Sequence, residues 1–169
     1  MNEPTAVFRT LIEATNRHDL DGIVACFADD VVSETPAHPA RSFVGSDQIR
    51  RNWSQILGSI GDFHATIHTL ETGPSGQVGA TAVWAELAFD GTRPDGLPFQ
   101  LRGVTVNEVL GGRIARLRFY LEPVEAGGLA PQEAVRAALG SAMVGSGAIL
   151  EGAAAANANG ATASAGGPR

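Results

Sequence analysis

The stretch from Asn16 to Val31 constrains the fold of this chain more than any other segment. Asp19 is a favourable N-cap, and Asp21 places a negative charge in the first helical turn, where the helix dipole stabilises it. Apolar residues then recur at helical spacing, which predicts that they are buried together: Leu20, Ile23, Val24 and Phe27. Asp29 and Asp30 are predicted to end this helix. The stretch therefore predicts a helix end, a short polar connection, a second helix and a strand in direct succession.

The rest of the pattern predicts an α+β fold in which helices come first and strands follow. A helix beginning just after Pro4 has one apolar face, made of Val7, Phe8, Leu11, Ile12 and Thr15. A later helix, capped by Ser46, presents Ile49, Trp53, Ile56 and Leu57 together. The two prolines in 36–42 predict a loop without regular structure. Strands are expected at 31–35, 63–70, 77–89, 99–110 and 113–122. We expect a curved antiparallel sheet wrapped around three N-terminal helices.

The C-terminal part of the chain differs in composition from the rest. Residues 126–169 contain no aromatic residue, and more than half of them are Ala or Gly. Such a segment buries little apolar area against the entropy cost of ordering it. The sequence therefore predicts a globular domain over 3–124, a short segment over 125–139 with a possible helix from Pro131 to Leu139, and a disordered tail over 140–169.

Charge and cysteine content exclude several classes of partner. The net charge is −6, and the basic residues, all Arg, form no cluster beyond Arg113, Arg116 and Arg118, which we interpret as a solvated strand face. Nucleic acid is therefore not an expected partner. The single Cys26 is typical of a reducing compartment. Because no segment has the length of a membrane span or the pattern of a signal peptide, we expect a cytoplasmic protein with no membrane partner, metal or cofactor.

The strand predicted at 77–89 is apolar on both faces. Val83, Ala85, Leu87 and Phe89 lie on one face, and Ala82, Trp84 and Ala88 share the other face with Glu86. An antiparallel sheet with one solvated face normally alternates between apolar and polar residues. Both faces are therefore expected to be covered, one by the helices and the other by a second subunit. We predict a homodimer that buries the face carrying Val83, Leu87 and Phe89.

Glu86 is the main catalytic candidate on sequence grounds. If it points inward with Trp84 and Ala88, desolvation raises its pKa towards the range of a general acid or base. The alternative is a cross-strand ion pair with Arg102, which would be structural and would lower that pKa. If paired with Arg102, Glu86 could still orient a polar ligand.

The helix–connection–helix–strand opening resembles the nuclear transport factor 2-like superfamily, whose members have a cone-shaped sheet that encloses a hydrophobic pocket. Within it, the segments Gly112-Arg113-Ile114-Ala115-Arg116 and Phe119-Tyr120-Leu121-Glu122 resemble the last strand of SnoaL-like polyketide cyclases. The resemblance implies that Glu122 stands at the position of the catalytic aspartate in those cyclases. Thr105 replaces their pocket histidine.

Comparison with two other branches of this superfamily removes candidate reactions. Against limonene epoxide hydrolase, Glu86 falls at one catalytic carboxylate, but Trp84 replaces the central arginine and Phe119 the second carboxylate. Against ketosteroid isomerase, Thr35 stands at the base, Leu11 at the oxyanion tyrosine and Thr105 at the protonated aspartic acid. The resemblance therefore implies neither epoxide opening nor steroid isomerisation.

His38, between two prolines, is a third candidate, because the unperturbed pKa of histidine suits proton transfer. Residues expected to contact a ligand are Trp53, Trp84, Arg102, Thr105, Phe119 and Tyr120. Two functions stay open. The first is cofactor-free general acid–base catalysis (cyclisation, isomerisation or dehydration) on an apolar carbonyl or polyketide-like compound, with Glu86, Glu122 and His38 as proton carriers. The second is a non-catalytic dimeric ligand-binding domain.

Overall fold

The computed structural model describes residues 3–125 and 127–140 of the chain. The chain divides into two units, Met1–Val124 and Glu125–Arg169. In the second unit residues 131–140 are helical, and the tail predicted to be disordered lies, except for Gly140, outside the described residues. The first unit carries the sheet and the helices that pack on it.

The N-terminal helices form where the apolar periodicity predicts them. Helix α1 spans Pro4–Asn16, with Pro4 in its first turn, and buries the predicted apolar face. Helix α2 spans Leu20–Ala25, and the Gly22 N–H donates to Asp19 Oδ1 at 2.9 Å, which confirms the predicted cap. Helix α3 spans Ser46–Ser59. The prediction that Ser46 caps this helix is wrong. Gly45 is the N-cap residue, Ser46 is the first helical residue, and no side chain makes a capping hydrogen bond.

The prediction that α2 continues to Asp29 and Asp30 is wrong. Strand β1 (Phe27–Glu34) begins two residues after α2 ends. The reason is a tertiary contact: the Ile114 N–H donates to the Cys26 carbonyl at 2.8 Å, and Phe27 pairs with Ile114. The two aspartates fit within this strand because its register shifts between Phe27 and Val32, where both remain exposed.

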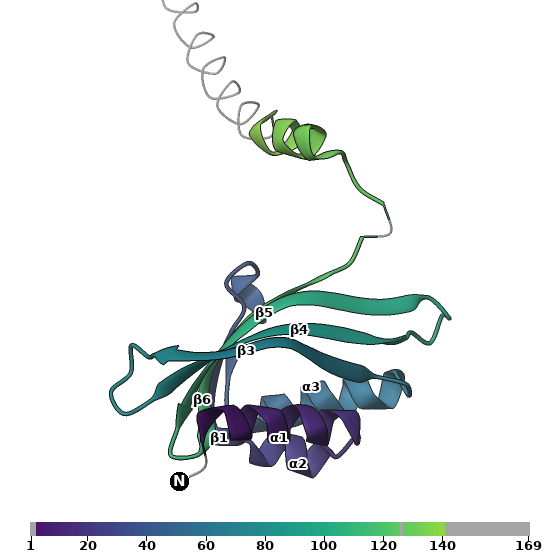
Figure 1. Ribbon diagram of the computed structural model, residues 1–169. Coiled ribbons are helices and arrows are strands. Elements are labelled where there is room, and N and C mark those ends of the chain that lie inside the picture. Colours follow the sequence, from purple (N-terminus) through teal and green to yellow (C-terminus); the bar gives the residue numbers. More distant parts are fainter. Residues whose placement is uncertain (1–2, 126, 141–169) are drawn as a thin grey trace, which may run out of the picture. The chain divides into compact units, whose positions relative to one another are not determined.

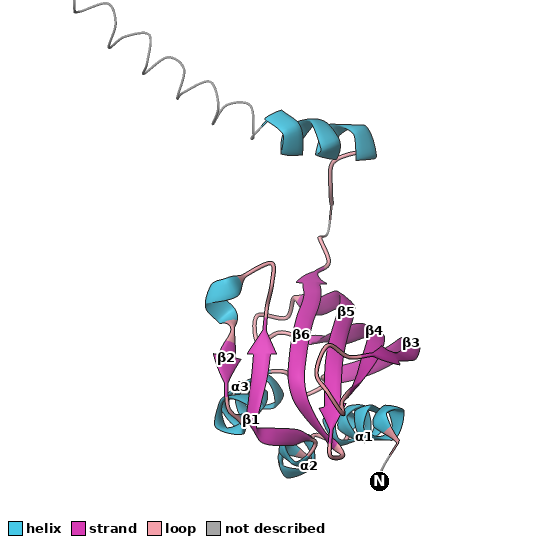
Figure 2. Cartoon of the chain, turned by 90° about the vertical axis from the view of Figure 1, so that its left-hand side faces the viewer, coloured by secondary structure: helices cyan, strands magenta, loops and turns pink. Residues whose placement is uncertain are grey.

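The strands form a six-stranded sheet with the order β2-β1-β6-β5-β4-β3 (Figures 1 and 2). Strands β1 and β6 are parallel, and the other neighbours are antiparallel. The bounds of the remaining strands are β2 Phe43–Val44, β3 His64–Pro74, β4 Thr81–Thr92, β5 Pro98–Leu110 and β6 Arg113–Pro123. The segment expected to be irregular contains one short 3₁₀ helix, η1 (Pro39–Arg41), which leads into β2.

The helices cover one face of a curved sheet (Figure 1). Gly103 permits close contact within the sheet: its φ is +151°, and a Cβ there would overlap the Tyr120 backbone of β6. Helix α1 is fastened to β3 because the Asn16 side chain accepts from the Ala65 N–H at 2.7 Å and donates to the Ala65 carbonyl at 2.9 Å. His18, in the turn after α1, lies 3.0 Å from the Phe63 carbonyl, consistent with a structural role.

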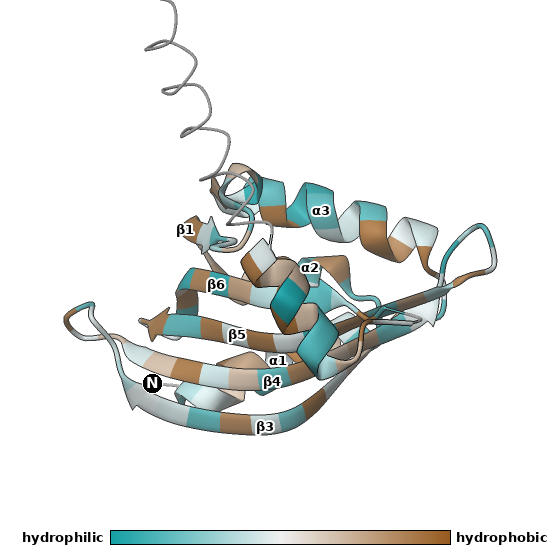
Figure 3. Cartoon of the chain, turned by 90° about the horizontal axis from the view of Figure 1, so that it is seen from above, coloured by the Kyte–Doolittle hydropathy of each residue, from teal (hydrophilic) through white to brown (hydrophobic). Residues whose placement is uncertain are grey.

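The two faces of β4 are reversed relative to the prediction. Val83, Ala85 and Leu87 belong to the inner face, which packs against the helices, and all of them are buried. Trp84 and Glu86 belong to the outer face and are exposed. The sequence did not show which face of β4 is the inner one, because the outer positions include the apolar residues Ala82 and Ala88. Both are buried in the structure. Figure 3 shows the resulting alternation of hydrophobic and hydrophilic residues along the strands.

Candidate functional site

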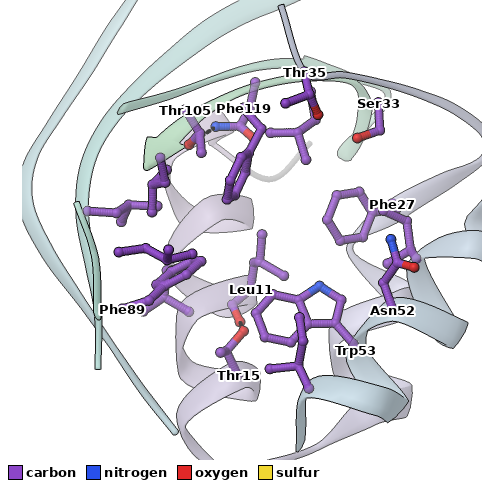
Figure 4. Close-up of a pocket in the computed structure, with 18 of the residues that line it drawn as sticks. Leu11, Thr15, Phe27, Ser33, Thr35, Asn52, Trp53, Phe89, Thr105 and Phe119 are labelled. Atoms are coloured by element: carbon purple, nitrogen blue, oxygen red, sulfur yellow. Dashed lines mark hydrogen bonds between the residues drawn. The ribbon is translucent and has the colours of Figure 1, made fainter. Parts of the chain in front are cut away.

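A cavity of about 270 Å³ lies between the inner face of the sheet and helices α1 and α3. Phenylalanines and one tryptophan form most of its wall, and they come from every layer of the fold. Figure 4 shows Phe27, Trp53, Phe89 and Phe119 pointing into the same space. All seven phenylalanines of the chain and one of its two tryptophans line the cavity: Phe8, Phe27, Phe43, Phe63, Phe89, Phe99, Phe119 and Trp53. Helices and strands far apart in sequence thus build one aromatic chamber.

The aromatic rings of this wall contact one another. Trp53 meets Phe63 edge-on, with ring centroids 5.5 Å apart, and lies 6.2 Å from Phe89. Phe63 is 5.3 Å from Phe89, and Phe89 is 6.5 Å from Phe119. Tilted and edge-on pairs at these separations are favourable beyond the area they bury. The wall is therefore a connected cluster, which holds the cavity in shape.

Two polar residues stand side by side on the inner face of β5. Asn107 is 1% exposed and Thr105 4% exposed, and both line the cavity. The Asn107 amide nitrogen donates to the Val83 carbonyl at 3.3 Å and to Thr105 Oγ1 at 3.0 Å. In the part of the chain that the structure describes, the Asn107 side-chain oxygen has no hydrogen-bond partner. A buried carbonyl oxygen without a partner is costly and calls for an explanation.

The other polar groups of the lining come mainly from β1, η1 and α3. Ser33 and Thr35 project from β1 and its end, Asn52 from α3, and Arg41 from η1. Among the described residues, Arg41 is the only ionisable side chain that lines the cavity. No Asp, Glu, His or Cys of the described chain does so, and none of these residues gathers in a group of three that could hold a metal ion. Among the described residues that line the cavity, none therefore carries an acid or base of the kind that exchanges a proton near neutral pH.

Glu86 lies outside the cavity, contrary to the prediction. Its carboxylate is on the outer face, where it accepts a hydrogen bond from Thr69 at 3.0 Å. Desolvation, the physical basis of the predicted proton-carrier role, is therefore missing. The predicted ion pair with Arg102 is also absent. Glu86 pairs in register with Val104, and the Arg102 guanidinium binds Asp90 at 2.7 Å.

Glu122 and His38 are brought together, also on the exposed side of the sheet. His38 Nε2 lies 3.1 Å from Glu122 Oε1, which links the loop after β1 to the end of β6. Glu122 stands opposite Arg102 in the β5–β6 register. Neither His38 nor Glu122 lines the cavity. The sequence had not placed these two candidates in contact, because the pairing depends on how the loop folds back.

The predicted ligand-contacting residues divide between the two faces. Trp53, Thr105 and Phe119 line the cavity. Arg102, Trp84 and Tyr120 do not: the aromatic pair is 50% and 41% exposed, on the outer face. Sequence reasoning missed Asn107 and Phe27 as lining residues. Strand parity could have found Asn107, because it lies two residues from Thr105 and therefore on the same face.

The outer face also carries a buried acidic residue that sequence reasoning missed. Glu108 is 5% exposed and binds Arg118 at 3.2 Å, with Arg116 at 3.8 Å. Arg116 also binds Glu34 at 2.9 Å. The interpretation of Arg116 and Arg118 as simply solvated is therefore wrong, since both are half-buried in an ion-pair network. Such a network costs desolvation and is weak evidence for either stability or catalysis.

Comparisons with known proteins agree with this architecture. The family model described as the SnoaL-like domain matches residues 8–117. Among curated proteins, none matches the chain at a significant level.

Solved structures match the fold at low identity. An epoxide hydrolase from Mycobacterium tuberculosis, of the limonene epoxide hydrolase-like type, is 24% identical, covering 69% of this chain and 80% of its own, with a TM-score of 0.56. A second protein of that organism, in complex with estradiol-17beta-hemisuccinate, is 22% identical over 69% of this chain and 91% of its own (TM-score 0.56). A nuclear transport factor 2-like protein of unknown function from Burkholderia pseudomallei is 20% identical over 72% and 92% (TM-score 0.58). At identities this low, the matches establish a shared fold and nothing about shared activity.

Proposed function

The chain belongs to the SnoaL-like domain family, and on that premise we propose that its cavity binds a small, largely apolar molecule of one or two rings. The observation that carries this proposal is the gathering of all seven phenylalanines and Trp53 around an internal space of about 270 Å³. A dry cavity of about 150 Å³ is enough to bind benzene. A larger aromatic-walled space therefore suits a ligand somewhat larger than benzene.

Of the two functions that the sequence left open, we favour ligand binding without catalysis by the cavity itself. A general acid or base must reach the reacting proton, directly or through one water. Within the described chain, the cavity lining offers Arg41 as its one ionisable group, and a guanidinium stays protonated. The alternative, acid–base catalysis by Glu86, Glu122 and His38, is supported by the His38–Glu122 contact alone, and that contact lies on the exposed side of the sheet.

We also propose that the protein is a homodimer that buries the outer face. Trp84 and Tyr120 are the two aromatic residues that do not line the cavity, and both are exposed on this face. They flank β5, with Trp84 opposite Val106 and Tyr120 opposite Val104. Exposed Trp and Tyr side chains on one face of a sheet are typical of interface anchors. This assigns the predicted dimer to the opposite face of β4. Cytoplasmic location remains a proposal that rests on the single, buried Cys26.

Naphthalene is a suitable probe for the proposed cavity function. We expect it to bind the full chain in a calorimetric titration and to raise Tm, because a ligand of the native state at 100 times its Kd adds about 2.7 kcal/mol to the free energy of unfolding. Ile56→Trp, which fills space from α3, should abolish binding. Val44→Trp adds the same side chain at an exposed position and should leave binding unchanged. Absence of binding, or binding that survives Ile56→Trp, would refute the proposal.

A further inference from the structure

The orientation of the Asn107 amide is fixed by its surroundings. Its nitrogen faces the Val83 carbonyl at 3.3 Å and Thr105 Oγ1 at 3.0 Å. Exchanging the nitrogen and oxygen would set the side-chain oxygen against the Val83 oxygen, and two acceptors cannot share a hydrogen bond. Both N–H donors are therefore used within the protein. The oxygen remains as a buried acceptor without a partner.

The neighbouring Thr105 hydroxyl complements this acceptor. Thr105 Oγ1 accepts from Asn107, so its own proton is left to donate. Thr105 is 4% exposed, and in the described part of the chain it has no hydrogen-bond acceptor. The pair therefore presents one free acceptor and one free donor from adjacent inner positions of β5. Thr105 also stands opposite Phe119 in the β5–β6 register, and Figure 4 shows the two side chains together at one side of the cavity.

We propose that the ligand carries a neutral hydroxyl group, which donates its proton to Asn107 Oδ1 and accepts the proton of Thr105 Oγ1. This inference rests on the proposed function and specifies the chemical class of its ligand as an aromatic or alicyclic alcohol. A hydroxyl is the smallest neutral group that satisfies both partners at once. The apolar part of the molecule then lies against the aromatic cluster of Trp53, Phe89 and Phe119.

Other polar groups fit this pair less well. An ether or ketone oxygen accepts from Thr105 but leaves the Asn107 oxygen buried and unpaired, which costs binding free energy. A phenolate or carboxylate would place negative charge against that oxygen. An ammonium would lose its hydration in a cavity whose described lining contains no carboxylate. The pair thus selects for a group that both donates and accepts.

The test compares 2-naphthol with 2-methoxynaphthalene and naphthalene by calorimetric titration of the full chain at pH 7. These probes share one ring system and differ in whether the oxygen can donate. We expect 2-naphthol to bind about tenfold more tightly than 2-methoxynaphthalene, the size of effect that one buried hydrogen bond supplies. In Thr105→Val and Asn107→Leu this preference should fall below about threefold. Thr69→Val removes the same hydroxyl on the outer face and should retain the preference.

The outcomes separate the two proposals. If all three probes bind with similar Kd values, the cavity function stands and the hydroxyl assignment is overturned. If none binds, the cavity function fails and the assignment fails with it. The comparison in the wild-type protein decides the question even if Asn107→Leu does not fold, and circular dichroism establishes whether that variant folds. A tenfold preference that persists in Thr105→Val would also overturn the assignment.

Discussion

The two faces of the sheet differ in chemistry although they alternate residue by residue along the same strands. On the inner face of β4, Leu87 and Phe89 line an aromatic cavity whose described lining contains one ionisable group, Arg41. On the outer face, Arg102 binds Asp90 at 2.7 Å, and Glu108 lies in an arginine network. The other carboxylates named as candidates, Glu86 and Glu122, are exposed on this face, whereas Glu108 is buried among the arginines. The difference supports the two proposals made above, an apolar ligand on the inner face and a homodimer contact on the outer face.

The largest effect expected from this comparison is on stability, between adjacent residues of β4. Leu87→Ala should lower the free energy of unfolding by about 2–5 kcal/mol, because Leu87 is 2% exposed and its loss enlarges a cavity. Glu86→Ala, one residue away on the exposed outer face, should change it by less than about 0.5 kcal/mol. Urea unfolding measures both values. Equal losses in the two variants would mean that the faces are not divided as described.

The next effect concerns assembly. Trp84→Glu should weaken the proposed dimer by about 2 kcal/mol or more, roughly 30-fold in its dissociation constant, because it replaces an aromatic anchor with a charge. Sedimentation equilibrium at micromolar concentration measures this dissociation constant. Val44→Glu places the same charge at another exposed apolar residue and serves as the control. A wild-type chain that sediments as a monomer would refute the dimer, without bearing on the cavity.

The smallest expected effect is on how stability depends on pH, through Asp90 on the outer face. Burial acts to raise the pKa of Asp90, but hydrogen bonds from Arg102 and Gln100, with the charges of Arg102 and His64, outweigh it and hold the pKa below its usual value. Because the pKa of Asp90 is lowered in the folded state, its ionised carboxylate stabilises the protein at pH values above the unfolded-state pKa of about 3.9. This contribution is lost as the pH falls through the folded-state pKa. Acid unfolding of Asp90→Asn should therefore depend less on pH below about 4 than acid unfolding of the wild type. Identical profiles would contradict this assignment.

The sequence alone predicted those features that depend on contacts between residues close together in the chain. Helix α1 and the Asp19 cap depend on neighbouring residues, and their sequence patterns were sufficient to predict them. To place Glu86, it was necessary to know which face of β4 packs against the helices. The sequence did not decide this, because both faces of the strand carry apolar residues. Only the packing of the helices against Leu87 shows which face is the inner one.

Contacts between distant residues account for the rest. The end of α2 is set by Ile114, which pairs with Phe27 from the other end of the domain. The unpaired oxygen of Asn107 depends on the register that brings the Val83 carbonyl to its amide nitrogen. A list of polar residues cannot show which hydrogen-bonding atoms are left over. The cavity was expected from the family resemblance, whereas its polar pair emerged only from the three-dimensional arrangement.

The most direct test of the central claim is to locate naphthalene on the protein by methyl NMR. With Leu and Val methyls labelled, a titration should shift Leu87, Leu101 and Leu117, which line the cavity, through the ring current of the bound molecule. Val104, on the outer face, and the exposed Leu97 should stay in place. Shifts confined to Val104, with Leu87 and Leu117 unchanged, would place the ligand on the outer face and contradict the assignment of the inner cavity as the binding site.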